Sequence, residues 1–153
     1  MATAAKFLAQ ECSRELVAVI WYGECMIRYS NASFFSTMDE APLVSMYYIQ
    51  NITKLPKRFT QLLNTTTMDL ASQASEVPAG LNKFGTKEAN FSDLQKIYRL
   101  LQCTPDLSTT DCNTCLRMVI GNLPGCCSGK QGANVLSPSC YARLGTKCIR
   151  FTR

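Results

Sequence analysis

Nine cysteines and the complete absence of histidine constrain this 153-residue chain more than any other feature. Three of them, Cys103, Cys112 and Cys115, are spaced C-x8-C-x2-C. Cysteines at this density form disulfides in an oxidising compartment, whereas in a reducing one they are more often metal ligands or redox pairs. The function of the motif therefore depends on the compartment and on the surrounding fold.

Three uses of these thiols can be compared. A zinc site would take its ligands from the two closely spaced pairs, Cys112, Cys115, Cys126 and Cys127. Adjacent cysteines argue against it, because neighbouring side chains on a strand point in opposite directions. A redox C-x-x-C would need a βαβ setting, which the pattern does not show. Disulfides are favoured, since residues three apart on a helix share a face and can each meet a strand cysteine. Spacing alone does not identify those partners.

Four N-x-S/T sequons bear on the compartment. They begin at Asn31, Asn51, Asn64 and Asn90, and none has proline in the middle position. Sequons are acceptors of N-linked glycans in the secretory pathway. We therefore expect an extracellular glycoprotein. Within this chain we expect neither a signal peptide, because residues 1–11 are short and already charged, nor a membrane span, because the apolar run at 16–23 is far shorter than the roughly 20 residues required.

An internal repeat organises the chain. CSRELVAVIWYGECMIRYS (residues 12–30) and CSGKQGANVLSPSCYARLG (residues 127–145) both read C-S-x11-C-x2-R, at a constant offset of 115 residues. In each copy an apolar run precedes the second cysteine, which predicts two successive strands. We expect residues 1–36 to be the C-terminal remnant of a first domain, with its last helix and final two strands. Residues 37–44 would be a linker, and 45–153 a second domain.

The second copy predicts an α+β domain. Strands are expected at 45–52, 94–103, 133–137 and 140–144, although the second also fits a helix by periodicity, and the stretch 83–92 that precedes it has no assignment. One helix begins at Pro56 and runs to about Ala74. A second is capped by Ser108 and runs to about Leu123, where Pro124 and Gly125 end it. This order predicts a small antiparallel sheet with helices packed on one face.

Charge and composition exclude several functions. The net charge of +5 would suit an acidic partner such as a pectic wall polymer. The charge is diffuse, and the interleaved basic and aromatic residues of nucleic-acid binders are missing, so we expect no nucleic-acid partner. Without histidine there is no Ser-His-Asp or Cys-His apparatus, and the acidic residues are scattered. We therefore expect no enzyme activity, no cofactor and no bound metal.

Two aromatic pairs are candidates for stacking on sugar rings. They are Trp21 with Tyr22, and Tyr47 with Tyr48. Aromatic residues in strands are more often part of the core, where they bury a large apolar surface. We therefore assign these four side chains to the core.

Two stretches of the sequence resemble a known plant family. CTPDLSTTDCNTCL and LPGCCSGKQGANVLSPSC are similar to the second copy of the salt-stress-response/antifungal domain, also called the ginkbilobin-homologous domain. IWYGECMIRYSNASFFS resembles the end of the first copy. Tandem domains of this kind occur in cysteine-rich secretory proteins and in the ectodomains of cysteine-rich receptor-like kinases. The resemblance implies two helices packed on a five-stranded antiparallel sheet.

The resemblance also implies a disulfide pattern. It pairs Cys103 with Cys112 and Cys115 with Cys140. The family's third bridge joins an N-terminal cysteine to the position of Cys127, and the second copy has no cysteine near its first strand. The three remaining cysteines of the second copy are therefore unassigned, with Cys148 paired to either Cys126 or Cys127 as the two alternatives. The partners of Cys12 and Cys25 would lie before Met1, so we expect both to be unpaired in a fragment or shortened gene product.

The resemblance implies mannose binding through an asparagine, an arginine and a glutamate. The matching positions in the second copy are Asn51, reached only through a gap, Asn134 and Gly145; in the first copy the last two are Val19 and Ser30. Charge-assisted hydrogen bonds to sugar hydroxyls are thus lost at two of the three positions.

We therefore expect a non-enzymatic extracellular recognition module of the plant stress and defence type. It would belong to a tandem-domain secreted protein or to a receptor-like kinase ectodomain. Its partner would be a cell-wall or fungal carbohydrate, or another ectodomain. The alternatives are a cationic antifungal effector and a four-cysteine zinc-binding module.

Overall fold

The computed structural model describes residues 2–22, 25–53, 56–92 and 94–146. They fall into two compact units, one within Met1–Phe35 and the other within Ser36–Ile149. None of the helices in this described part of the chain has an apolar stretch long enough to cross a bilayer.

The first unit is a helix followed by a hairpin. Helix α1 (Ala2–Glu11) precedes strands β1 (Val17–Trp21) and β2 (Met26–Ser30), which pair antiparallel. Tyr29 closes the unit, because its Oη donates a hydrogen bond to the carbonyl oxygen of Cys12 at 2.6 Å. The predicted order of one helix and two strands is confirmed. Strand β1 also lies at the repeat offset from strand β6 of the second unit, so the sequence repeat is kept in the secondary structure.

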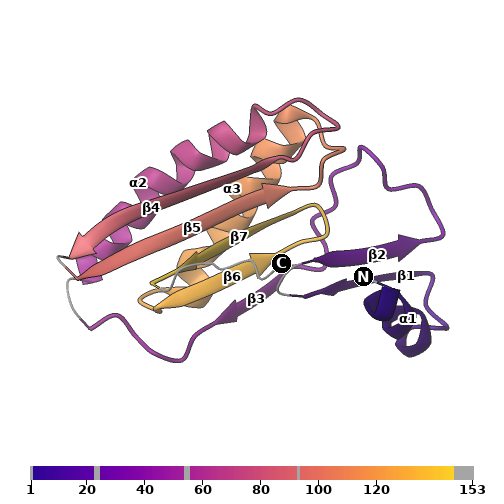
Figure 1. The fold of residues 1–153 in the computed structure, drawn as a ribbon, viewed down its shortest axis with the longest axis horizontal. Coiled ribbons are helices and arrows are strands. Elements are labelled where there is room, and N and C mark those ends of the chain that lie inside the picture. Colours follow the sequence, from indigo (N-terminus) through magenta and orange to yellow (C-terminus); the bar gives the residue numbers. More distant parts are fainter. Residues whose placement is uncertain (1, 23–24, 54–55, 93, 147–153) are drawn as a thin grey trace. The chain divides into compact units, whose positions relative to one another are not determined.

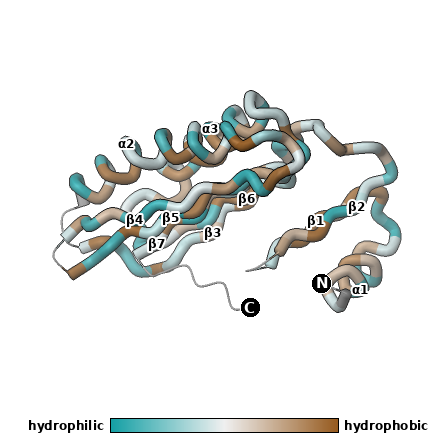
Figure 2. Tube along the Cα trace, turned by 45° about the horizontal axis from the view of Figure 1, so that its top comes forward, coloured by the Kyte–Doolittle hydropathy of each residue, from teal (hydrophilic) through white to brown (hydrophobic). Residues whose placement is uncertain are grey.

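The second unit is a five-stranded antiparallel sheet with two helices on one face (Figure 1). The strands are β3 (Val44–Tyr47), β4 (Phe84–Ser92), β5 (Gln95–Cys103), β6 (Gly132–Leu136) and β7 (Cys140–Gly145). Their order is β3-β6-β7-β5-β4, so β7 is the central strand and β3 and β4 are the edges. Helices α2 (Pro56–Ser75) and α3 (Thr109–Cys127) lie together over the sheet (Figure 2). The predicted α+β fold is confirmed.

The main core lies between the helices and the sheet. Alternate residues of the strands point toward the helices, as the two-residue period of a strand requires. The side chains that form this core are Leu70, Ala71 and Ala74 of α2, Cys112, Cys115, Leu116, Val119 and Ile120 of α3, and Leu101, Cys103, Val135, Cys140 and Ala142 of the strands, together with Leu107. The other residues of each strand make up the opposite face, which carries no helix.

Helix α2 contains an Asn-Thr-Thr-Thr stretch that is a poor helix former. The hydroxyls of Thr65, Thr66 and Thr67 each donate a hydrogen bond to the carbonyl oxygen four residues earlier in the helix. These bonds satisfy the hydroxyls within the helix, and burial of Thr67 holds this turn against the sheet. Packing therefore overrides the weak local propensity.

The prediction that the second helix ends at Pro124 is wrong, because α3 continues through it to Cys127. The last turn packs Leu123 and Cys127 against Leu144, and this burial favours helix beyond the proline. The stop comes instead at Gly129, whose φ of 71° is the left-handed conformation that commonly follows a helix C-terminus. The first strand of the domain was also predicted too long, since β3 spans only Val44–Tyr47.

Candidate functional site

Two disulfides join the start of α3 to the sheet. The structure links Cys103 to Cys112, with Cα atoms 5.8 Å apart, and Cys115 to Cys140, with Cα atoms 6.0 Å apart. Cys103 and Cys140 are direct cross-strand neighbours at the paired ends of β5 and β7. One turn of the helix is thus bridged to two adjacent strands, through the same pairs that the family resemblance implies. This arrangement holds the scaffold together and lies on the inner face of the sheet.

The other cysteines lie apart from these two disulfides. Cys126 and Cys127 belong to the last turn of α3, not to a strand, and the structure joins these two neighbours to each other. That pair is neither of the alternatives weighed for Cys148, which itself lies outside the described residues, so its partner stays a prediction. Cys12 and Cys25 have free thiols.

The zinc alternative loses all four of its ligands, because the sulfurs of Cys112 and Cys115 are in disulfides with other residues and those of Cys126 and Cys127 are bonded to each other. Within the described ranges, no group of three or more cysteine, aspartate or glutamate side chains lies close enough to hold a metal ion. The structure therefore gives this alternative no site.

The four sequon asparagines are exposed. Asn31 follows β2, Asn51 lies after β3, Asn64 is in the middle of α2, and Asn90 is on the edge strand β4. An exposed side-chain amide is accessible to a glycan, so the structure leaves all four available for modification.

The three positions matched to the mannose-binding residues lie toward one end of the sheet. Asn134 is on β6 and Gly145 on β7, while Asn51 is paired by an isolated bridge to Lys130, just before β6. The amide of Asn51 is already engaged, since its Oδ1 accepts a hydrogen bond from Lys130 Nζ at 2.9 Å. Only Asn134 thus offers an uncommitted polar side chain among the three.

Arg143 lies beside Asn134 and was not predicted as a site residue. It is the direct cross-strand neighbour of Asn134 on β7, and of Leu100 on the other side. Because directly opposed residues share a face, all three belong to the face that carries no helix, which we call the outer face. The sequence signal was the C-x2-R of the repeat, which places an arginine at 28 and at 143. In the first unit Arg28 lies 4.2 Å from the ring centroid of Phe34.

The outer face is rich in aromatic and amide groups around Arg143. The outward-pointing residues that define this face on the three inner strands are Tyr98, Leu100 and Gln102 of β5, Asn134 and Leu136 of β6, and Tyr141 and Arg143 of β7. Tyr141 Oη donates a hydrogen bond to Gln102 Oε1 at 2.8 Å. Burial raises the pKa of Tyr141, and the nearby positive charge of Arg143 partly offsets this rise. Tyr141 therefore remains a protonated hydrogen-bond donor at neutral pH.

Arg143 is a partly buried cation at the centre of this face. Across the described part of the chain, no carboxylate, carbonyl or other group pairs with its guanidinium in a hydrogen bond or salt bridge. A guanidinium offers five N–H donors in a planar fork that fits carboxylates and vicinal acceptor oxygens. Neighbouring tyrosine rings provide flat apolar surfaces beside it. The arrangement can therefore bind a polar, ring-containing ligand.

The aromatic candidates are placed differently from the prediction. The assignment of Tyr22, Tyr47 and Tyr48 to the core is wrong, since these side chains are 46%, 52% and 46% exposed. Trp21 is half-buried in the first unit. The sequence suggested burial because all four adjoin strands, but β3 is an edge strand with few neighbours.

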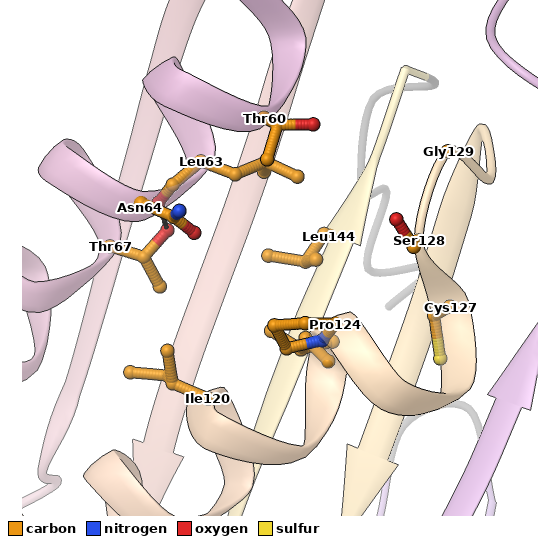
Figure 3. A pocket seen from close by; sticks show the side chains of 11 residues that line it. Thr60, Leu63, Asn64, Thr67, Ile120, Pro124, Cys127, Ser128, Gly129 and Leu144 are labelled. Carbon is orange, nitrogen blue, oxygen red and sulfur yellow. Dashed lines mark hydrogen bonds between the residues drawn. The ribbon is translucent and has the colours of Figure 1, made fainter. Parts of the chain in front are cut away.

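A pocket of about 60 Å³ lies between the helices and β7 (Figure 3). Leu63 and Thr67 of α2, Ile120 and Pro124 of α3, and Leu144 of β7 line it. Ligand-binding pockets usually have roughly 300–1,000 Å³, so this space is too small for a sugar residue. We place the candidate site on the outer face instead.

Comparisons with known proteins agree with this architecture. The family model described as salt stress response/antifungal matches residues 47–147. Cysteine-rich receptor-like protein kinase 25 of Arabidopsis thaliana is 46% identical over 144 residues, which cover 94% of this chain and 21% of that protein. The antimicrobial ginkbilobin-2-like protein of Castanea crenata is 37% identical over 141 residues, which cover 92% of this chain and 56% of that protein. The chain thus spans about a fifth of the kinase and about half of the shorter relative.

Solved structures share the fold. The crystal structure of the tandem DUF26 ectodomain of the Arabidopsis thaliana cysteine-rich receptor-like protein PDLP8 matches with a TM-score of 0.76 at 20% sequence identity, over 96% of this chain and 65% of that one. The corresponding ectodomain of PDLP5 matches with a TM-score of 0.66 at 26% identity, over 95% of this chain and 64% of that one.

Proposed function

Because the chain belongs to the salt stress response/antifungal family, and its relatives include a cysteine-rich repeat secretory protein and cysteine-rich receptor-like kinases, we propose that it is a non-enzymatic recognition module that binds carbohydrate through its outer face. Its extracellular, cysteine-rich domain type follows from the family. Our proposal adds to this domain type a class of ligand, carbohydrate, and a binding surface, the outer face.

The unpaired guanidinium of Arg143 carries this proposal. Leaving a partly buried charge without a partner is costly unless a ligand completes it. In the family's mannose mechanism the arginine would stand at Asn134, and here the cation lies directly across on β7, where opposed Cα atoms are roughly 4.5–5.5 Å apart. The positive charge is thus displaced by one strand and not lost. Sugar hydroxyls, or the carboxylates of an acidic wall polymer, are acceptors of the right kind.

Binding to an array of plant and fungal cell-wall glycans tests this directly. We expect Arg143→Gln to weaken binding of the best glycan about tenfold or more, as expected for the loss of a charged hydrogen-bond donor. Arg117→Gln is the matched control, because it removes the same charge from the exposed surface of α3, where Arg117 Nε donates a hydrogen bond to Asn113 Oδ1 of its own helix. Equal losses of affinity in both variants would show that binding depends on the net charge of the protein. If the protein binds none of the glycans on the array, the proposal of carbohydrate binding is refuted.

The relative described as antimicrobial favours a second candidate, an antifungal effector. The same two variants discriminate it in a fungal growth assay. A cationic effector that acts through net charge loses activity equally in Arg143→Gln and Arg117→Gln, whereas an effector that acts through glycan recognition loses it only in the first.

We also propose N-glycans at Asn31, Asn51, Asn64 and Asn90, and a domain division in which residues 1–36 are the end of a first copy and 45–153 the second. The exposure of all four amides supports the first proposal, and the repeated strand positions support the second. Peptide mapping of protein secreted from plant cells, before and after enzymatic removal of glycans, tests the four sites one by one.

A further inference from the structure

The β3 edge of the sheet exposes an unusual amount of apolar surface. Met46, Tyr47 and Tyr48 are 47%, 52% and 46% exposed, and Leu43 and Ile49 on either side are 38% and 87% exposed. No charged residue occurs anywhere between positions 41 and 53. An exposed apolar edge strand is a template for pairing with another strand.

The opposite edge of the same sheet is protected. Strand β4 carries Lys87 and Glu88, and its pairing with β5 is interrupted by a register shift between Asn90 and Ser92. Charges and bulges of this kind are the usual devices that prevent edge-to-edge association. Since one edge has these devices and the other lacks them, the β3 edge is the one available for pairing.

The backbone of β3 also offers free hydrogen-bonding groups. Tyr48 N donates to Gly132 O at 2.9 Å, so in an antiparallel ladder the N–H and C=O groups of Met46 and Val44 face β6 as well. The corresponding groups of Ser45 and Tyr47 then face away from the sheet. The regular pairing of β3 with β6 ends at Ile49. Beyond it the two chain segments pair again with the register shifted by one residue, because Gln131 N donates to Gln50 O.

We propose that β3 pairs with β3 of a second copy of this chain, antiparallel about a two-fold axis at Met46. The free groups of Ser45 then bond to Tyr47 of the other copy and the reverse, while Met46 faces Met46 and Val44 faces Tyr48. The pairing is self-complementary, and no two like charges of the strand meet across it. Lys130 is the charged side chain near this edge; its ammonium lies 5.2 Å from the ring centroid of Tyr47 and on the inner side of the sheet, away from Met46.

The register adds an argument for a second copy as the partner. Met46, Asn134 and Arg143 lie in one row across β3, β6 and β7. Pairing Met46 with Met46 continues this row into the other copy, so the two Arg143 residues are separated by five strand spacings, about 24 Å. If the proposed function is correct, the two sites of the dimer lie in line on one continuous face and bind a polymer with avidity.

Dimer formation is tested in the absence of any sugar. A negative result for the dimer is therefore distinguishable from a negative result for carbohydrate binding. Sedimentation velocity of the disulfide-intact protein over a concentration series is expected to show a weak dimer, because an edge contact is smaller than the roughly 1,200 Å² of stable interfaces. Met46→Lys and Met46→Glu each place like charges at the two-fold axis, and each is expected to weaken the dimer about fivefold or more. An equimolar mixture of the two variants should restore it.

Phe84→Lys is the matched control, since Phe84 is 53% exposed on the other edge strand and its replacement should leave association unchanged. Hydrogen exchange at the amides of Ser45 and Tyr47 should slow as concentration rises. The proposal is overturned if the protein is monomeric at all concentrations up to about 1 mM. It is also overturned if the mixture of charge variants fails to restore the dimer, or if Phe84→Lys weakens it as much.

Discussion

The two bridges of α3 close chain loops of different length, and this difference predicts how much each contributes to stability. Cys103 and Cys112 are 9 residues apart, and Cys115 and Cys140 are 25 apart. In the chain-entropy model, a longer closed loop removes more freedom from the unfolded chain. The expected contributions are about 2.7 kcal/mol and about 3.5 kcal/mol, each a large share of the 5–15 kcal/mol typical of a domain.

Comparing removal of the two disulfides isolates the effect of loop length, because the surroundings of the four cysteines are similar. All four cysteines belong to the same core cluster and are at most 3% exposed. Replacing either pair by alanine therefore removes similar atoms from a similar environment, and the cavity contributions nearly cancel. We expect Cys115→Ala with Cys140→Ala to lower the free energy of unfolding by about 0.8 kcal/mol more than Cys103→Ala with Cys112→Ala.

Guanidinium chloride unfolding followed by far-UV circular dichroism measures this difference. Cys12 and Cys25 are replaced by serine in all three proteins, so that free thiols do not exchange with the bridges. The midpoints are compared at a shared slope, which avoids the error of long extrapolation. The reasoning is refuted if the variant without the short loop is as destabilised as the variant without the long loop, or more so.

Arg99→Met should raise the melting temperature, with a gain of about 1–3 kcal/mol. Arg99 is 1% exposed, and among the described residues only its Nη2 has a hydrogen-bond partner, Leu62 O at 2.9 Å, while Nε and Nη1 are buried without one. A lower melting temperature would contradict this reasoning. Burial lowers the pKa of Arg99 to about 10, so between that pH and about 12 the unfolded chain binds more protons and the free energy of unfolding should rise with pH. Lysines and tyrosines titrate in the same range in both proteins, so denaturant titrations should show this rise as an increase with pH in the difference between the free energies of unfolding of the parent protein and of Arg99→Met. Ser108→Ala should cost about 1 kcal/mol, because Ser108 Oγ accepts the N–H of Asp111 at 3.0 Å and donates to Asp111 Oδ2 at 2.7 Å. Ser108→Thr keeps a hydroxyl that can make both bonds and should retain nearly full stability; equal melting temperatures for the two variants would count against the cap.

Elements with a strong periodic pattern could be predicted from the sequence. The helix expected at 56–74 is α2, and the three strands expected after it are β5, β6 and β7, whose alternating apolar residues contact the helices. Strand β4 (Phe84–Ser92) was not assigned from the sequence. The end of α3 could not be placed, because burial of Leu123 and Cys127 against a distant strand outweighs the local stop signal of Pro124. Exposure of Tyr47 and Tyr48 was missed for a related reason: the strand's position at the edge follows from the sheet order, which the linear sequence does not contain.

The candidate site was predictable only in part. Asn134 and Gly145 could be located through family resemblance, but Arg143 was not predicted as a site residue. Its importance depends on two facts of the sheet, namely that β7 is the central strand and that Arg143 is opposed to Asn134. Strands that are adjacent in sequence often pair, but here β7 lies between β6 and β5, which are separated by α3 along the chain. A pattern within one strand cannot reveal such a neighbour.

Strand β7 shows how the scaffold and the recognition surface can change separately. Cys140, Ala142 and Leu144 point into the core, and Cys140 carries the long-loop disulfide. Tyr141 and Arg143 alternate with them and point to the outer face. A substitution at an outward position thus changes the groups of the proposed ligand site without replacing the disulfide or the core side chains of the strand. For this reason the cysteine motif identifies the fold, whereas the specificity that we propose rests on Arg143 and its outer-face neighbours.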